Sequence, residues 1–264
     1  MAVSFKDNSA LWDDFYHGHC TQRLGELGFP AFSSTKIVLK ERPSELQDLQ
    51  GKIDTFWQNY NAANEGARNG KLYALSGWDD FEYGRGTLMV RAYETNFATL
   101  LVKTSKEGLT SKEAEFLDKK VMFLGSGGYI QNDNKYLVGK VAKRNVKQDL
   151  WESVPQGFVS YGFHHHEDPF RKTLEKEGKE ETALDVAFDF EIVRPYGINL
   201  GPRAGNCTII YHLQLRSSSL EKIKCSSEHL DLRWATLGEV LDPAQRYAWT
   251  PITRRLFEKI AEEK

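Results

Sequence analysis

Hydrophobic and polar positions repeat with two different periods in the first part of the chain, and these periods predict its helices and strands. Residues 35–40 and 87–94 are rich in β-branched and apolar side chains, which predicts two strands. Residues 44–63 place apolar side chains three or four positions apart, which predicts a helix, with Ser44 as its N-cap after Pro43. We therefore expect this part to be α+β.

A charged connector marks the expected boundary between two parts of the chain. Residues 102–116 alternate charged and polar side chains, with a helix start predicted at Ser111. We expect residues 1–117 to form an N-terminal α+β region, with a role in substrate specificity as one interpretation. Residues 118–264 are expected to form a second domain.

The second part alternates strands with two helices. The helix pattern at 169–183 follows Asp168, a good N-cap, and Pro169, which suits a first helical turn. Because one charged helix separates the strands and an amphipathic helix closes the chain, we expect an α/β/α sandwich on a mixed sheet. The strands are predicted at 121–130, 135–142, 190–198, 207–215 and 230–237, and the closing helix at 252–263.

Composition narrows the classes of function. An apolar fraction of 40% and a charged fraction of 27% are typical of a soluble globular protein, and a net charge of −2 does not indicate nucleic-acid binding. The sequence indicates neither a membrane span nor a signal peptide, and it gives no indication of an oligomeric state. The three cysteines are far apart and predict neither a disulfide framework nor a zinc site, so we expect a reducing compartment, the cytoplasm.

Three glutamates on the predicted helix are the first sign of chemistry. Glu177, Glu180 and Glu181 stand at i, i+3 and i+4, so they share one helix face, where like charges repel. Such a face either points into water, as most Lys- and Glu-rich helices do, or binds a cation. Mg²⁺ prefers oxygen ligands of this kind. The residues alone leave both interpretations open.

The segment around these glutamates resembles the Nudix box, G-x5-E-x7-R-E-U-x-E-E-x-G-U, in which U is a bulky aliphatic residue. The segments 150–162 and 226–241 also resemble the family's strand and loop before the box and its acidic segment after it, so the resemblance covers residues 120–264. Aligned without a gap, the box positions are held by Gly162, Asp168, Lys176, Glu177, Glu180, Glu181, Ala183 and Leu184.

The resemblance implies a metal-dependent pyrophosphohydrolase. It implies that Glu177, Glu180 and Glu181 bind Mg²⁺, with Mn²⁺ as an alternative, and that the substrate is a nucleoside diphosphate linked to another moiety. A bound metal polarises phosphorus and lowers the pKa of a water molecule. Glu228 stands where some members carry a further carboxylate that orients or deprotonates this water, and an exposed structural glutamate is the alternative.

The chain departs from the box at four positions. Asp168 takes the place of the first glutamate and has a shorter side chain. Lys176 replaces an arginine and makes no bidentate fork to a carboxylate. Gly178 replaces an aliphatic residue, which predicts an unfilled core contact and costs about 1 kcal/mol of helix propensity. Ala183 lacks the left-handed freedom of the usual glycine at the helix end. These departures keep a second function open, a Nudix-fold module that binds a nucleotide-linked ligand without turnover; a structural interaction protein is a third.

Candidate substrate contacts lie outside the glutamate helix. Guanidinium groups match phosphate oxygens, which makes Arg144, Arg194 and Arg203 candidates, although a solvated arginine is the commoner outcome. The histidine run 164–166 is interpreted as loop residues near the site, because adjacent side chains rarely bind one ion together. Residues 93–101 resemble the N-terminal extension of Nudix proteins that cleave UDP-sugars. This resemblance implies a nucleotide-sugar substrate, with Thr95 and Asn96 near the junction of the two parts.

Overall fold

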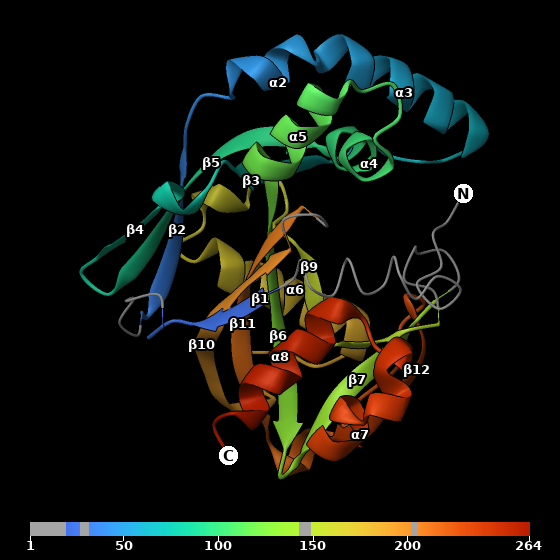
Figure 1. The fold of residues 1–264 in the computed structure, drawn as a ribbon. Helices are drawn as coiled ribbons and strands as arrows, with labels where there is room; N and C mark the ends of the chain where they lie inside the picture. Colours follow the sequence, from blue (N-terminus) through green and yellow to red (C-terminus); the bar gives the residue numbers. More distant parts are fainter. Residues whose placement is uncertain (1–19, 27–31, 143–148, 202–204) are drawn as a thin grey trace.

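The computed structural model describes residues 20–26, 32–142, 149–201 and 205–264. The fold is mixed α/β, as predicted: twelve strands of the described chain form one curved sheet, and helices cover both of its faces (Figure 1). None of the helices in these ranges combines the length and the apolar composition that a membrane span needs.

Seven strands form the central path of the sheet. The pairs β11–β6 and β2–β5 are parallel, and the other neighbours along the path are antiparallel. In spatial order the strands are β1 (Cys20–Arg23), β10 (Phe190–Gly201), β11 (Asn206–Leu215), β6 (Met122–Asn132), β3 (Lys71–Leu75), β5 (Thr87–Asn96) and β2 (Ser34–Leu39).

The sheet divides along β6. Residues 125–127 of β6 pair with β9, whereas residues 131–132 pair with β7, which in turn pairs with β8 and β12. The sheet is therefore split beside β9. There the helix α6 (Pro169–Thr182) packs against both β6 and β9. The branching strands are β4 (Phe81–Gly84, on β5), β7 (Lys135–Val141), β8 (Trp151–Ser153), β9 (Gln156–Phe158) and β12 (His229–Thr236).

Neighbouring residues of β11 show how the two faces are covered. Ile209 belongs to the core that contains Phe170 and Leu174 of α6 (Pro169–Thr182), whereas Ile210 belongs to the core that contains Phe257 of α8 (Pro251–Ala261). Successive side chains of a strand point to opposite faces, so α6 and α8 cover opposite faces of the sheet. In Figure 1, α8 lies in front of the central strands and α6 behind them.

The remaining helices complete the two ends of the molecule. Four of them lie together above the strands in Figure 1, and α7 packs on α8 at the other end. They are α2 (Ser44–Asp48), α3 (Gln50–Ala63), α4 (Phe97–Ser105), α5 (Ser111–Lys120) and α7 (Leu237–Leu241); the short turns η1 (Trp78–Asp80), η2 (Phe163–His165), η3 (Ser217–Lys222) and η4 (Pro243–Ala248) link strands and helices.

The predicted helix over 44–63 differs from the structure in two details. It is divided at Leu49 into α2 and α3, and the N-cap is Pro43, so the prediction of Ser44 as N-cap was wrong. Ser44 is already helical, and its hydroxyl donates to the neighbouring Glu45 carboxylate at 3.1 Å. The predicted start of α5 at Ser111 is confirmed, with Thr110 and Glu113 forming a capping box.

The sheet crosses the predicted boundary at residues 117 and 118. Ala74 and Leu75 of β3 pair with Phe123 and Met122 of β6. Phe123 also shares a hydrophobic core with Leu46 of α2. The two parts of the chain are therefore joined by backbone hydrogen bonds and by a common core, and their division into domains stays a prediction.

Candidate functional site

The start of α6 is fixed by its cap. The carboxylate of Asp168 accepts a hydrogen bond of 3.0 Å from the Arg171 backbone N–H, which confirms the predicted N-cap. The Thr35 hydroxyl of β2 donates to the same carboxylate, and burial raises the pKa of Asp168. Because Phe170 and Leu174 are fully buried, the axial rotation of α6 is fixed as well.

Two glutamates of α6 point inwards against β9. Glu177 is 7% exposed and Glu181 is 4% exposed, whereas the side chain of Glu180 is 51% exposed. Glu177 packs on Gly157, and Glu181 Oε1 accepts a 3.2 Å hydrogen bond from the Gln156 backbone N–H. Glu181 Oε2 is buried and has no hydrogen-bond partner among the described residues. Glu181 Oε2 is thus a buried carboxylate oxygen that lacks a hydrogen-bond donor or a cation as its partner.

Burial and neighbouring carboxylates disfavour ionisation of both inward glutamates. The pKa of Glu181 is raised well above its ordinary value, first by burial and then by Glu152, Glu177 and Glu228. The pKa of Glu177 is raised by burial and, to a lesser extent, by Glu180 and Glu228. Five carboxylates therefore act on one another electrostatically, and a divalent cation would reduce their mutual repulsion.

Lys176 is the cation that the chain itself supplies. Its Nζ lies 2.9 Å from Glu177 Oε1 and 2.9 Å from Glu180 Oε2, so the ammonium group pairs with two carboxylates. The ion pair with Lys176 lies where the Glu180 side chain is exposed, at the edge of the carboxylate cluster. The structure thus separates the three glutamates into a buried pair, Glu177 and Glu181, and an exposed third, Glu180, and Lys176 bridges Glu177 to Glu180.

Three residues of the site were not predicted from the sequence. Glu152 of β8 acts on the pKa of Glu181, and the buried His229 holds its Nε2 at 3.5 Å from Glu152 Oε1. Gly157, and not Gly162, is the glycine in contact with Glu177. The sequence signal for Glu152 and Gly157 is their place in the segment 150–162, directly before the helix. His229 follows the predicted Glu228, which is exposed.

Two of the departures, Gly178 within the helix and Ala183 at its C-cap, have clear structural consequences. A Cβ atom at Gly178 would lie 3.1 Å from Val186 Cγ2 and 3.4 Å from the Leu184 carbonyl oxygen. Val186 therefore fills the space, and the expectation of an unfilled core contact was wrong. Ala183 ends α6 with φ +62°, the left-handed conformation that a glycine usually takes there.

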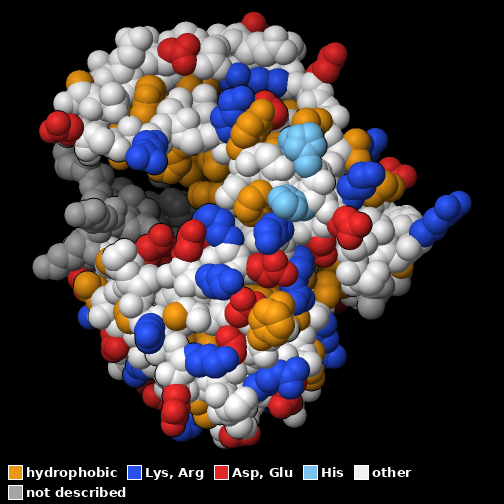
Figure 2. Space-filling view, turned by 180° about the vertical axis from the view of Figure 1, so that it is seen from behind, with side chains coloured by type: hydrophobic (Ala, Val, Ile, Leu, Met, Phe, Trp, Pro, Cys, Tyr) orange, Lys and Arg blue, Asp and Glu red, His pale blue; other side chains and the backbone are white. Residues whose placement is uncertain are grey.

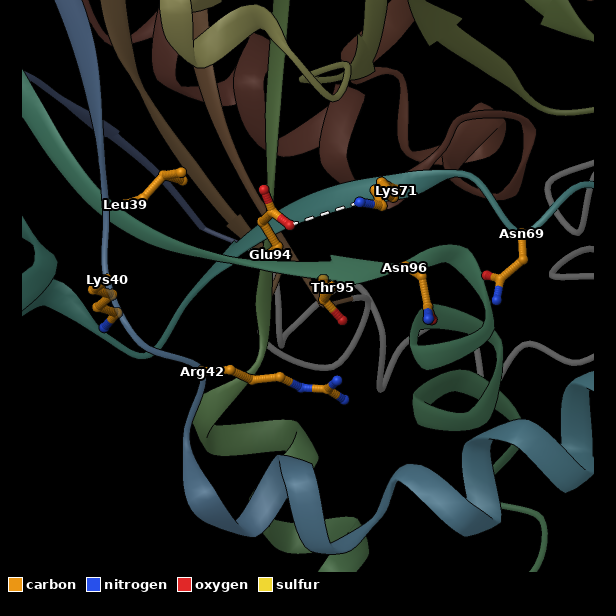
Figure 3. Close-up of a pocket in the computed structure, with 8 residues that line it drawn as sticks. All are labelled: Leu39, Lys40, Arg42, Asn69, Lys71, Glu94, Thr95 and Asn96. Carbon is orange, nitrogen blue, oxygen red and sulfur yellow. Dashed lines mark ion pairs between the residues drawn. The ribbon is translucent and has the colours of Figure 1, made fainter.

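The other predicted contacts do not join the glutamates. Arg144 and Arg203 lie outside the described residues. Arg194 of β10 is exposed and pairs in register with His212, which stacks on Tyr129 of the core beneath α8, the face opposite α6. Asn96 caps α4 and lines a separate pocket in the N-terminal part (Figure 3).

The histidine run contacts the N-terminal part of the chain. His164 Nδ1 is hydrogen-bonded to the Tyr73 hydroxyl of β3, and the same hydroxyl accepts a 3.0 Å bond from the Gly162 backbone N–H. Burial and the neighbouring His165 lower the pKa of His164. His164 thus anchors the segment before α6 to β3, and Figure 2 shows histidine side chains exposed on one face of the molecule.

The donor set of the cluster fits a hard divalent cation. Within the ranges that the structure describes, no three His, Cys, Asp or Glu side chains are arranged as a ready metal site. Mg²⁺ needs fewer protein ligands than this, because it commonly keeps several waters and uses one or two carboxylates together with substrate phosphates. Glu177 and Glu181 supply two carboxylates, and the unpartnered Glu181 Oε2 offers an oxygen ligand without breaking a hydrogen bond.

Comparisons with known proteins give similarities of structure only. No family model and no curated protein match the chain. A bifunctional NMN adenylyltransferase/ADP ribose pyrophosphatase from Francisella tularensis is 16% identical with a TM-score of 0.40, and the alignment covers 54% of this chain and 42% of that one. This chain therefore spans less than half of the Francisella enzyme.

Two further solved structures show the same level of similarity. A NUDIX hydrolase from Nitrosomonas europaea is 18% identical with a TM-score of 0.39, and 55% of this chain and 75% of that chain are covered. The E. coli dihydroneopterin triphosphate pyrophosphohydrolase is 19% identical with a TM-score of 0.34, with 53% and 96% covered. Because these TM-scores are below 0.5, the chemistry of the site is inferred from this chain's own residues.

Proposed function

We propose that the chain is a Nudix-type pyrophosphohydrolase that uses a divalent cation, Mg²⁺ or Mn²⁺, to cleave a diphosphate bond. The observation that carries this proposal is Glu181, a buried carboxyl with a raised pKa and an unpartnered oxygen, next to the equally inward Glu177. A carboxylate cluster without a cation destabilises the folded protein, so its presence on a helix face favours a role in binding one.

We assign the residues distinct roles. Glu177 and Glu181 hold the cation, and Glu180 keeps Lys176 beside Glu177. When bound, the cation supplies charge neutralisation at the phosphate and an activated water. Glu228 is exposed yet close enough to raise the pKa of both inward glutamates, which suits a group that orients or deprotonates the attacking water. His229 restrains Glu152 at the back of the cluster.

The substrate we propose is a nucleoside diphosphate linked to another moiety, with a nucleotide-sugar as the finer assignment. Support for the finer assignment is the resemblance of residues 93–101 to the extension of proteins that cleave UDP-sugars. Hydrolysis would release a nucleoside monophosphate and a phosphorylated partner. The near-neutral net charge does not favour nucleic acid as the substrate.

One contact favours a second function, a sensor that binds a nucleotide-linked ligand without turnover. Lys176 Nζ already neutralises Glu177 at 2.9 Å, and an ammonium group in this place competes with a metal ion. A sensor would keep this ion pair while the ligand is bound. A hydrolase would have to exchange it for the metal.

A substrate panel separates these functions. Release of phosphate or nucleotide is measured from UDP-glucose, ADP-ribose and a dinucleoside polyphosphate, with Mg²⁺ and with a chelator. We expect Mg²⁺-dependent turnover, and we expect Glu177→Gln and Glu181→Gln each to lower it by more than about 100-fold, since losing even a residue that merely supports a metal ligand typically costs about 10- to 100-fold.

The same helix provides the controls. Glu175→Gln, on α6 outside the cluster, should retain full turnover, and Glu180→Gln should lose less than either inward variant. Full activity in both Glu177→Gln and Glu181→Gln would remove the site assignment. Thermal stabilisation by a nucleotide without turnover would establish the sensor in place of the hydrolase.

A further inference from the structure

A pocket in the N-terminal part lies between β2, β3, β5 and the start of α4 (Figure 3). Its volume is about 580 Å³, which is within the range of small-molecule sites. None of the glutamates of α6 lines it. The lining residues are Leu39, Lys40, Arg42, Asn69, Lys71, Glu94, Thr95 and Asn96.

Thr95 places an unsatisfied hydroxyl in this pocket. The residue is only 6% exposed, and its Oγ1 has no hydrogen-bond partner in the part of the chain that the structure describes. In Figure 3 the Thr95 side chain points between Arg42 and Asn96. A buried hydroxyl without a partner costs stability, so a ligand atom that bonds to it would gain this energy back.

Two asparagines turn donor groups away from α4. Asn69 Oδ1 accepts from the Ala98 backbone N–H at 2.8 Å, and Asn96 Oδ1 accepts from the Thr99 backbone N–H at 3.0 Å. Because the partners are N–H donors, the facing atoms must be the carboxamide oxygens. The NH₂ groups of both asparagines are therefore not used in these bonds to the helix, and both residues line the pocket.

The charges of the pocket favour an anion. Lys40, Arg42 and Lys71 line it, against one carboxylate, Glu94. Arg42 is fixed in place, since its Nη1 donates to Gln50 Oε1 at 2.6 Å and its Nη2 to the Leu46 carbonyl oxygen at 3.1 Å. Lys40 is already paired with Asp80 at 2.6 Å, and Lys71 lies 4.0 Å from Glu94. The uncompensated cation is thus Arg42.

We propose that this pocket binds a phosphate monoester of the size of a sugar phosphate. The fixed guanidinium supplies a fork for phosphate oxygens. The Thr95 hydroxyl and the two carboxamide NH₂ groups supply hydrogen bonds to the acceptor-rich remainder. The cavity is larger than inorganic phosphate requires. The site is independent of the hydrolysis proposed for α6, because it uses residues 39–96 alone.

Calorimetric titration of the full chain in the absence of divalent metal tests this site. The probes are glucose 1-phosphate, inorganic phosphate, gluconate and glucose. We expect glucose 1-phosphate to bind more tightly than inorganic phosphate or gluconate, and glucose not to bind. The proposal would be overturned if glucose bound as tightly as glucose 1-phosphate, or if gluconate or inorganic phosphate bound more tightly than it. It would also be overturned if glucose 1-phosphate showed no saturable binding at millimolar concentration.

Variants at two lining positions are expected to change the affinity for glucose 1-phosphate in opposite directions. Thr95→Val is nearly isosteric and should weaken glucose 1-phosphate binding about fivefold to tenfold, without lowering the melting temperature, because it removes an unsatisfied buried hydroxyl. Glu94→Gln removes the opposing carboxylate and should tighten binding about threefold to tenfold.

Matched controls come from the same strands. Thr87→Val, at the other end of β5, and Glu82→Gln, on β4, should leave the affinity unchanged. If Thr95→Val binds as the wild type does, or if Glu94→Gln weakens binding, the pocket is not the site. Hydrolysis by the α6 cluster is measured in parallel in all four variants, so that loss of one proposal is not confused with loss of the other.

Discussion

Gly157 of β9 lies so close to Glu177 of α6 that a Cβ atom at position 157 would fall 2.3 Å from Glu177 Cδ and 2.4 Å from Oε1. Real Cβ atoms do not approach so closely, so only glycine allows this packing. The preceding residue, Gln156, donates its backbone N–H to Glu181. Two consecutive residues of a three-residue strand therefore position both inward carboxylates.

We predict that Gly157→Ala impairs the metal site while the protein still folds. The added methyl group must displace the Glu177 side chain, and a displacement on the order of 1 Å costs up to about 100-fold in rate at a positioned site. Turnover should fall by at least about tenfold, and the Mg²⁺ concentration for half-maximal activity should rise. Both are read from a Mg²⁺ titration of activity, with circular dichroism to verify folding.

Gly162→Ala is the matched control. Gly162 holds the first glycine position of the ungapped Nudix match, yet a Cβ atom there would meet no described atom within 4 Å. Its φ of +90° makes alanine strained, at a cost of about 1 to 2 kcal/mol in the free energy of unfolding. We expect a lower melting temperature and an unchanged Mg²⁺ dependence. A metal defect in Gly162→Ala alone would show that the wrong glycine has been assigned to the site.

The raised pKa of Glu181 predicts an opposing effect of pH and metal on stability. A carboxyl whose folded pKa lies above its ordinary value of 4.5 contributes stability below that value, and this contribution is lost as pH rises through the folded pKa. Without metal, the melting temperature of the wild type relative to Glu181→Gln should therefore fall as pH rises above 4.5. Mg²⁺ binds the ionised form, so its stabilising effect should grow over the same range.

The difference in melting temperature between the wild type and Glu181→Gln isolates the contribution of Glu181. The pKa of His212 is lowered by burial to about 4, which makes the protein less stable as pH falls, but this contribution is common to both and cancels. Glu175→Gln, measured in the same way, should track the wild type. A difference that stays constant with pH and does not respond to Mg²⁺ would contradict the assigned environment of Glu181.

Two hydroxyl groups link the N-terminal part to the segment that enters α6. Tyr73 of β3 bonds to Gly162 and His164, and Thr35 of β2 donates to the Asp168 cap. We predict that Tyr73→Phe and Thr35→Val each lower the free energy of unfolding by about 1 kcal/mol. Each should also reduce turnover, because both links orient the start of the glutamate helix. Urea unfolding and the substrate assay measure these effects.

Tyr83→Phe, on β4, is the control for the loss of a tyrosine hydroxyl and should change neither quantity. If the Tyr73 and Thr35 variants lose stability but keep the wild-type turnover, the N-terminal part supports the fold without positioning the site. That result would favour the boundary at residues 117 and 118 as a true division between domains.

Local pattern predicted the glutamate helix because its determinants are local. Asp168 and Pro169 start α6, and the spacing of Phe170 and Leu174 fixes the buried face. The spacing of Glu177 and Glu181 then places both on one side. The strands that were predicted around the helix follow from the same kind of short-range signal, and the α/β class follows from their order.

The rest of the site depends on contacts that no local pattern contains. Gly157 meets Glu177 only because β9 pairs with β6 while α6 packs over both. Glu152 approaches Glu181 through β8, which pairs with β7. In the same way Val186 fills the space at Gly178 after the chain has turned back past the end of α6. Periodicity identifies a face of a helix but not the residues that will be packed against it.

The left-handed Ala183 at the end of α6 predicts a simple gain of stability. An L-residue with φ +62° pays roughly 1 to 2 kcal/mol of steric strain that glycine does not. Ala183→Gly should therefore raise the free energy of unfolding by about 1 kcal/mol, after the greater flexibility of glycine in the unfolded chain is subtracted. The melting temperature should rise by about 2 to 4 °C.

Ala187→Gly, at an exposed position without a positive φ, should change stability in the opposite direction or not at all. Ala183 lies two residues beyond Glu181, and its methyl group can neither bind the cation nor make a hydrogen bond, so turnover of Ala183→Gly should match the wild type. A drop in melting temperature like that of Ala187→Gly would mean that the end of α6 does not adopt this conformation.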